Sequence, residues 1–276
     1  MSDFEEKFGS LSRVYGDEVL HRIRGLHICI VGLGGVGSWA AEALARSGVG
    51  KLTLVDGDTI SKSNINRQLH ALDSTIGQSK AAVMCDRILQ INNECEVQMI
   101  EQFIDDDNKR DILERGYDGV LDAIDTLRFK AEIIHNCKRN KVPVVTTGGA
   151  GGLTDPTMIT INDLSRTWND PLASALRLCL RQQYRFTRNP KNSFGVPCIY
   201  STEQQRYTDK DGNPDYRKPG VSGLSLDCFS GYGSTVMVTA SFGFTAAAKI
   251  IDFVLKKKFK ENYGPDPDDT SSNNRS

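Results

Sequence analysis

The sequence predicts an α/β protein with a Rossmann-like N-terminal half, whose parallel strands continue into a mixed sheet with helices on both faces. Three consecutive features indicate this fold. Residues 26–31 form a short β-branched run, which is typical of a buried parallel strand. A glycine-rich segment at 32–37 and a helical segment of small residues from Ser38 follow it directly. A second strand at 51–55 ends at Asp56, which completes a βαβ unit.

The glycine-rich segment predicts a phosphate site. Glycine lets the chain turn tightly and lets a phosphate approach the backbone amides, which a Cβ atom would block. The helix that follows points its N-terminal amides at the same place. Asp56 lies where an acid accepts hydrogen bonds from ribose hydroxyls. A tight turn without a ligand is the alternative. The glycines concerned are Gly32, Gly34, Gly35 and Gly37.

Composition restricts the class of protein. The 276 residues, 39% of them hydrophobic, suffice for one large domain or two small ones. A net charge of −1 means that no overall field attracts nucleic acid or membrane. The seven cysteines are scattered without a CxxC pair, which argues against a disulfide framework or a zinc site and favours the cytoplasm. The acidic N-terminus lacks the apolar segment of a secretory signal.

Four regions are expected along the chain. They are an N-terminal helical arm (1–25), a nucleotide-binding Rossmann-like region (26–155), a C-terminal half that completes the sheet (156–255) and a disordered tail (256–276). Within them, the polar segment 203–220 predicts a mobile loop. This loop and the glycine run at 148–152 are either lids or simple connectors.

Polar residues downstream of Asp56 favour a triphosphate over a dinucleotide. Hydride transfer needs no cation near phosphate, whereas attack on a phosphoryl group needs its developing charge stabilised. Asp125 lies at the end of a predicted strand at 117–126, and strand ends of this kind face the ligand crevice, so it is a candidate metal ligand. The Gly-Lys-Ser/Thr signature of a P-loop is absent. The other candidates are Asp58, Asn64, Arg67, Gln68 and Lys80.

An arginine series in the C-terminal half suggests an anionic ligand. A helix is predicted from about residue 170 to 186, and the arginines there recur at spacings of four, four and three, which places them on one face. Such a face is either solvated or the footprint of a nucleic acid. The four arginines are Arg177, Arg181, Arg185 and Arg188.

An uncharged run at 228–248 is long enough to cross a membrane. Its serine, threonine and glycine content instead favours a buried helix packed closely on the sheet. We therefore expect no stable membrane insertion.

The motifs together resemble those of the ubiquitin-activating-type adenylating enzymes, which include the activators of sulfur carriers. The matching patterns, in order and spacing, are G-x-G-G-x-G at 32–37, D-x-D at 56–58, S-N-x-N-R-Q at 63–68, G-x-x-K at 77–80 and D-x-x-D at 122–125. They cover about residues 10 to 150. Further patterns are similar to the tRNA threonylcarbamoyladenosine dehydratases and extend the resemblance to about residue 255. These are R-x-Y-G at 13–16, the D-P-L helix start at 170–172 and S-T-E at 201–203.

This resemblance implies a function and a role for each matching residue. The function is ATP-dependent cyclisation of the threonylcarbamoyl group on the adenosine next to the anticodon of tRNA, through an acyl-adenylate. The resemblance assigns Asp56 to the ribose, Asn64, Arg67 and Lys80 to the phosphates, and Asp125 to a Mg²⁺ ion. Arg13 would reach the phosphates of a partner subunit across a homodimer. A sulfur-relay protein is a further candidate partner.

Other functions remain compatible with the sequence. The first is adenylation of a ubiquitin-like sulfur carrier protein, although such activators commonly carry paired CxxC zinc ligands that this chain lacks. An NAD-dependent oxidoreductase would use the same glycine turn without ATP, and a non-catalytic adaptor would bind ATP without pyrophosphate exchange. Cys179, Cys198 and Cys228 are either thioester-forming residues or buried apolar side chains.

Overall fold

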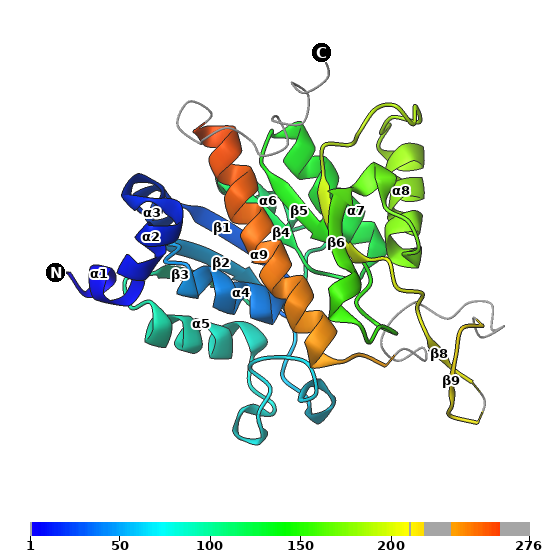
Figure 1. Ribbon diagram of the computed structural model, residues 1–276, viewed down its shortest axis with the longest axis horizontal. Coiled ribbons are helices and arrows are strands. Elements are labelled where there is room, and N and C mark those ends of the chain that lie inside the picture. Colours follow the sequence, from blue (N-terminus) through cyan, green and yellow to red (C-terminus); the bar gives the residue numbers. More distant parts are fainter. Residues whose placement is uncertain (1, 210, 218–232, 260–276) are drawn as a thin grey trace, which may run out of the picture.

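The computed structural model describes residues 2–209, 211–217 and 233–259. Its centre is a seven-stranded sheet in the order β3-β2-β1-β4-β5-β7-β6, with helices on both faces (Figure 1). The strands are β1 (His27–Val31), β2 (Lys51–Val55), β3 (Glu96–Ile100), β4 (Gly119–Asp122), β5 (Val144–Thr147), β6 (Ile159–Asp163) and β7 (Pro197–Ser201). Neighbouring strands are parallel except β6 and β7. The predicted mixed α/β fold is confirmed.

One face of the sheet is covered by α4 (Gly37–Arg46), α5 (Lys80–Ile91) and α9 (Val236–Lys258), whose core includes Leu44 and Phe242. The other face is covered by α6 (Lys109–Leu113), α7 (Leu127–Arg139) and α8 (Pro171–Gln183), around Ile134 and Tyr200. Apolar residues therefore face both layers of helices, as expected for the central strands of a parallel sheet.

Short elements complete the described residues. At the N-terminus lie α1 (Asp3–Phe8), α2 (Ser12–Tyr15) and α3 (Asp17–Arg24), with the 3₁₀ turn η1 (Gly9–Leu11) between the first two. The other 3₁₀ turns are η2 (Lys62–Asn64), η3 (Asp73–Thr75), η4 (Pro156–Met158) and η5 (Leu164–Arg166). A separate hairpin joins β8 (Tyr207–Thr208) to β9 (Pro214–Asp215), within the segment for which the sequence predicts a mobile loop.

Helix α9 contains residues 236–248 of the uncharged run and continues into a charged end. By length and composition alone it could cross a membrane, yet 61% of its apolar window is buried inside the protein. Gly243 lies so close to α4 that a Cβ atom there would come within 2.6 Å of the Val36 carbonyl oxygen. This close contact supports the predicted buried helix. The helix begins at Val236, and residues 228–232 of the predicted span lie outside the described residues, as do residues 260–276 of the predicted tail.

One prediction about local structure is wrong. The helix expected to reach residue 186 ends at Gln183, and Arg185 has a left-handed φ of 57°, which no helix accommodates. Arg185 and Arg188 therefore follow the helix in a loop, and the four arginines do not share one helical face.

Candidate active site

A cavity of about 900 Å³ opens at the carboxyl ends of the parallel strands. Its floor lies between β1 and β4, where the strand order changes direction and open α/β sheets bind their ligands. Ten of the residues predicted from the sequence line it: Gly32, Gly34, Gly35, Asp56, Asp58, Asn64, Arg67, Gln68, Lys80 and Asp125. The fold thus brings together residues that are spread over almost a hundred positions of the chain.

The glycine turn is shaped by its own close packing. Gly32 has a φ of 88°, and a Cβ atom there would lie 2.8 Å from the Ile124 side chain. A Cβ atom at Gly37 would lie 1.8 Å from the Gly32 carbonyl oxygen. Gly37 does not line the cavity, so its role is to let α4 begin directly against the turn.

Asp56 holds the glycine turn against the end of β2. Its side chain is 8% exposed and accepts hydrogen bonds from the backbone amides of Leu33, at 2.6 Å, and Asp58, at 2.8 Å. Each carboxylate oxygen carries a second acceptor site. Asp56 therefore fixes the turn and still offers acceptors toward the cavity that it lines.

Lys80 brings a positive charge into the cavity wall from the first turn of α5. Its side chain is only 7% exposed, and its Nζ lies 2.7 Å from Asp58 Oδ2. Asp58 is about half exposed, so solvent and ligands reach this ion pair from the Asp58 side. Lys80 is thus a nearly buried cation that already points toward the open part of the site.

The segment 61–68 forms another part of the cavity wall. Arg67 donates from Nη1 to the Ser63 carbonyl, at 2.7 Å, and to Asn66 Oδ1, at 3.0 Å. Asn64 accepts from the Ser61 amide at 3.0 Å, which closes the turn η2. Gln68 is 6% exposed, and its Oε1 atom has no hydrogen-bond partner among the described residues. These local bonds hold the polar side chains along the cavity.

Buried beneath this wall is His70, which is 2% exposed. Burial lowers its pKa to about 4, and the positive charge of Lys80 adds to this effect. Neither ring nitrogen has a hydrogen-bond partner among the described side chains. His70 is thus a neutral packing residue at physiological pH.

Asp125 lies in the loop between β4 and α7, with its side chain exposed at the cavity. The loop is held from below by Asp122 and Lys130, both fully buried, whose charged atoms are 3.0 Å apart. Lys130 also donates to the Ile124 carbonyl at 2.9 Å, and Thr146 donates to Asp122 at 2.6 Å. Burial raises the pKa of Asp122, and Lys130 opposes that shift. The pair thus supports the loop without lining the cavity.

Asp125 is the residue best placed to hold a metal ion with a nucleotide. Its carboxylate has no ion-pair or hydrogen-bond partner among the described residues and lines the cavity. Mg²⁺ is usually held by one or two carboxylates together with substrate phosphates. The described residues contain no group of three or more His, Cys, Asp or Glu side chains placed to hold a metal ion, so they form no closed metal cage. A single carboxylate fits a metal that arrives with phosphate.

The other predicted residues lie away from this cavity. Arg13 is exposed on α2 and is not among the residues that line it. Arg181 is half-buried, with its guanidinium 5.3 Å from the centre of the Phe194 ring. Arg185 and Arg188 are exposed in the loop after α8.

The cysteines that the structure describes do not line either cavity. Cys198 is buried and Cys179 partly buried, and burial raises the pKa of both thiols above the ordinary value. A raised pKa disfavours the nucleophilic thiolate. Cys228 lies outside the described residues.

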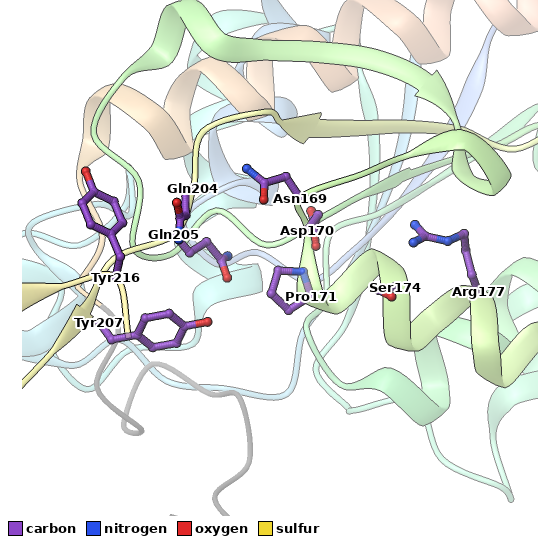
Figure 2. Close-up of a pocket in the computed structure, with 9 residues that line it drawn as sticks. All are labelled: Asn169, Asp170, Pro171, Ser174, Arg177, Gln204, Gln205, Tyr207 and Tyr216. Carbon is purple, nitrogen blue, oxygen red and sulfur yellow. The ribbon is translucent and has the colours of Figure 1, made fainter. Parts of the chain in front are cut away.

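A second cavity, of about 350 Å³, adjoins the first. The two share Pro171 and Gln205, and Figure 2 shows Gln205 and Tyr207 pointing toward Pro171. Arg177 lines the second cavity and donates a hydrogen bond to Thr167. Burial lowers the pKa of Arg177. Sequence patterns alone missed Gln205 and Tyr207, because both occur in a polar segment without periodicity.

Asp170 joins the walls of the two cavities. It caps α8 by accepting from the Ala173 amide, at 2.8 Å, and it accepts from the Gly149 amide at 3.0 Å. A Cβ atom at Gly148 would lie 1.8 Å from Asp170 Oδ2, so the backbone after β5 approaches α8 closely. Burial raises the pKa of Asp170, while these backbone hydrogen bonds oppose the shift.

The chain has close relatives over nearly its whole length. It is 47% identical to a tRNA threonylcarbamoyladenosine dehydratase of Haemophilus influenzae over 258 residues, which are 94% of this chain and 97% of the relative. Its fold matches the Escherichia coli tRNA N6-threonylcarbamoyladenosine dehydratase solved in complex with ATP, with a TM-score of 0.83, 43% identity and coverage of 94% and 98% of the two chains. The same enzyme solved with AMP gives a TM-score of 0.81 and 44% identity, with coverage of 93% and 97%.

A family model defines the wider group. The ThiF family model matches residues 8–270 and therefore spans both the glycine turn and the C-terminal half. The ubiquitin-activating-type resemblance predicted from the motifs is thus confirmed. This chain belongs to the ThiF family, in the branch formed by the tRNA threonylcarbamoyladenosine dehydratases.

Proposed function

We propose that this protein catalyses the ATP-dependent cyclisation of the threonylcarbamoyl group on the adenosine next to the anticodon of tRNA. The observation that carries the proposal is the cavity in which the glycine turn, Arg67, Lys80 and Asp125 meet. Its relatives supply the substrate, since the dehydratases that it resembles are named for it. The anion-binding turn and the two cations fit a triphosphate better than a nicotinamide dinucleotide.

The chemistry proceeds in two steps. The threonyl carboxylate attacks the α-phosphorus of ATP, so that a carbon-bound oxygen becomes bonded to phosphorus and pyrophosphate leaves. A nucleophilic atom of the same threonylcarbamoyl group then attacks the activated carbonyl carbon and loses its proton to solvent, while AMP leaves with the carboxylate oxygen. One molecule of ATP is converted to AMP and pyrophosphate, and the substrate loses the elements of one water.

The residues of the cavity have different roles in this reaction. The backbone amides of the glycine turn and of the first turn of α4 face the phosphates. Arg67 and Lys80 offset the negative charge that develops on the leaving pyrophosphate, and Lys80 exchanges Asp58 for phosphate oxygens. Asp56 keeps the turn in place and accepts from the ribose. Asn64 and Gln68 supply neutral polar contacts along the wall.

Asp125 is the residue that would hold Mg²⁺. The ion neutralises charge on the phosphates when it is bound. Asp125 contributes a free carboxylate at the cavity, and the buried Asp122–Lys130 pair keeps its loop in position.

A homodimer would complete the site. Arg13 is exposed and outside the cavity of its own chain, so it is available to the phosphates bound by a partner subunit. Exposed apolar side chains support self-association, because an interface would bury them. They are Ile65, Leu72, Met237 and Phe244. Asn66 donates to the Ser234 carbonyl at 2.9 Å and so links the two segments that carry them.

The proposed tRNA substrate implies a cytoplasmic location. A sulfur-relay protein as a further partner stays a prediction.

Mass spectrometry of the product tests the function. The purified protein is incubated with Mg²⁺ and tRNA carrying threonylcarbamoyladenosine, with and without ATP, and the RNA is digested to nucleosides. We expect the modified nucleoside to lose the mass of one water, and only with ATP. An unchanged nucleoside, together with pyrophosphate exchange that depends on a small carrier protein, would assign the site to a sulfur carrier instead.

A further inference from the structure

The carboxylate and the base of the proposed substrate are close together in the molecule. Four covalent bonds separate the threonyl carboxyl carbon from N6 of the adenine, which is about 5 Å from standard bond lengths. If the carboxylate reaches the α-phosphate of ATP in the larger cavity, the base must lie immediately beside that cavity. The smaller cavity occupies this position, since both cavities share Pro171 and Gln205.

The smaller cavity suits a nucleobase. Its volume of about 350 Å³ falls in the range of small-ligand sites, roughly 300–1,000 Å³. At the β8–β9 hairpin, Tyr207 in β8 and Tyr216 directly after β9 line the cavity, and Tyr216 is 52% exposed (Figure 2). Bases of single-stranded RNA loops stack on aromatic side chains. Arg177 lines the opposite end, where its positive charge suits the phosphate backbone of the same nucleotide.

Gln205 lies at the junction with an unused hydrogen-bond acceptor. The residue is 8% exposed, and its side-chain oxygen Oε1 is buried without a hydrogen-bond partner among the described residues. Buried polar atoms are usually hydrogen-bonded, so an orphaned acceptor between two cavities indicates a donor on a ligand. The threonylcarbamoyl group supplies one, because the urea that joins the base to the threonine carries two N–H groups.

We propose that the smaller cavity receives the modified adenine base, with Gln205 accepting a hydrogen bond from the urea N–H and the aromatic side chains of the β8–β9 hairpin stacking on the base. This inference rests on the proposed function and identifies the residues that recognise the modification. Gln205 lets the protein distinguish modified from unmodified tRNA, because an unmodified adenosine lacks the urea and leaves Gln205 without a hydrogen-bond partner. Sites that hydrogen-bond a substrate group discriminate strongly against analogues without it.

Two anticodon stem-loop RNAs test the proposal, one with the threonylcarbamoyl group and one without. Their dissociation constants are measured by fluorescence anisotropy in the presence of a non-hydrolysable ATP analogue. We expect the wild-type protein to bind the modified RNA at least about tenfold more tightly than the unmodified RNA. Leaving one buried polar group without a partner weakens binding by about this factor. Gln205→Leu keeps the volume and removes the acceptor, so the ratio of the two constants should fall close to one.

Controls separate recognition from folding. Gln90→Leu, at an exposed glutamine of α5, should leave the ratio unchanged, and ATP-analogue affinity should stay within about twofold in both variants. Tyr207→Ala should weaken binding of the modified RNA on the order of tenfold, while Tyr207→Phe, which keeps the ring, should not.

The proposal is overturned if Gln205→Leu keeps the wild-type ratio, whether or not both affinities fall together. It is also overturned if the wild-type protein forms the cyclic product yet binds both RNAs equally. Failure of the wild-type protein to form the product at all would instead remove the proposed function on which this inference rests.

Discussion

Asp122 and Lys130 form an ion pair of 3.0 Å in which both side chains are completely buried. The pair connects the end of β4 to the first turn of α7, and the loop between them carries Asp125. Neither residue lines the larger cavity. Their role is to hold the loop that carries Asp125 rather than to line the cavity.

Removing one partner of this pair should be costly. Lys130→Met leaves a buried carboxylate without its cation, so we expect the free energy of unfolding to fall by about 3–5 kcal/mol. Urea denaturation followed by circular dichroism measures it. The control Lys109→Met removes a partly exposed lysine that pairs with Asp106 and Glu132, and should cost no more than about 1 kcal/mol. Adding Asp122→Asn to Lys130→Met should restore part of the lost free energy of unfolding. If Lys130→Met and Lys109→Met lower the free energy of unfolding equally, the Asp122–Lys130 pair does not have this structural role.

Asp125→Asn should abolish turnover and leave the fold intact. The substitution keeps the shape of the side chain but removes the charge that would hold the metal, so we expect product formation to drop at least about a hundredfold. The unfolding midpoint should not change, because this carboxylate has no partner among the described residues. The matched control is Asp107→Asn, at an exposed position outside the cavity. Wild-type turnover in Asp125→Asn would exclude the metal role.

The role of Arg13 is tested by mixing two inactive proteins. Arg13→Ala and Asp125→Ala should each be inactive alone. A mixed dimer has one site with both residues intact, so co-expression of the two variants should recover about a quarter of wild-type activity. Each variant co-expressed with itself is the control. If the mixture stays inactive while dimers exchange, Arg13 does not act across the interface.

The loop after α8 should contribute to tRNA binding through its exposed arginines. The double reversal Arg185→Glu and Arg188→Glu should weaken tRNA binding and reduce the slope of log affinity against log salt concentration, because fewer counterions are released. Filter binding at several salt concentrations measures both effects. Arg110→Glu with Arg139→Glu changes the net charge equally at exposed positions of other elements. If both double variants lower the affinity to the same extent, the effect is one of net charge.

His70 should make the protein less stable in acid. Its folded pKa is about 4, below the ordinary value of 6.5, so the unfolded chain binds a proton that the folded protein excludes. This contribution is fully present above pH 6.5 and is lost as the pH falls toward 4, by on the order of 2 kcal/mol between pH 7 and pH 5. His70→Met should remove that part of the decline in urea denaturation, whereas His21→Met, at an exposed site of α3, should not. Identical pH profiles for wild type and His70→Met would contradict the buried neutral state.

Much of the candidate site could be predicted from the sequence because its parts are local. The glycine turn follows β1 without a gap, and Asp56 and Asp125 each come just after a strand of the sheet. Strand ends meet at one edge of a parallel sheet, so the order of elements along the chain was enough to bring these residues together.

Other features depend on tertiary packing, which the periodicity of the sequence does not reveal. Lys130 lies in an amphipathic helix among other charged residues, so the sequence alone indicates a solvated lysine, and only the fold shows that it is buried and pairs with Asp122. The spacing of the arginines predicted that the helix continues past residue 183, but the backbone adopts a left-handed conformation at Arg185. Gln205 became a candidate only when burial left its side-chain oxygen without a partner.

The carboxylate of Asp170 bonds the amide of Gly149 on one side and that of Ala173 on the other. The glycine run borders the larger cavity, and α8 borders the smaller one. A single side chain therefore links the walls of both cavities, and the covalent link of the proposed substrate must match their separation. A substrate with one more residue between its carboxylate and its base would place one of these two groups outside its cavity.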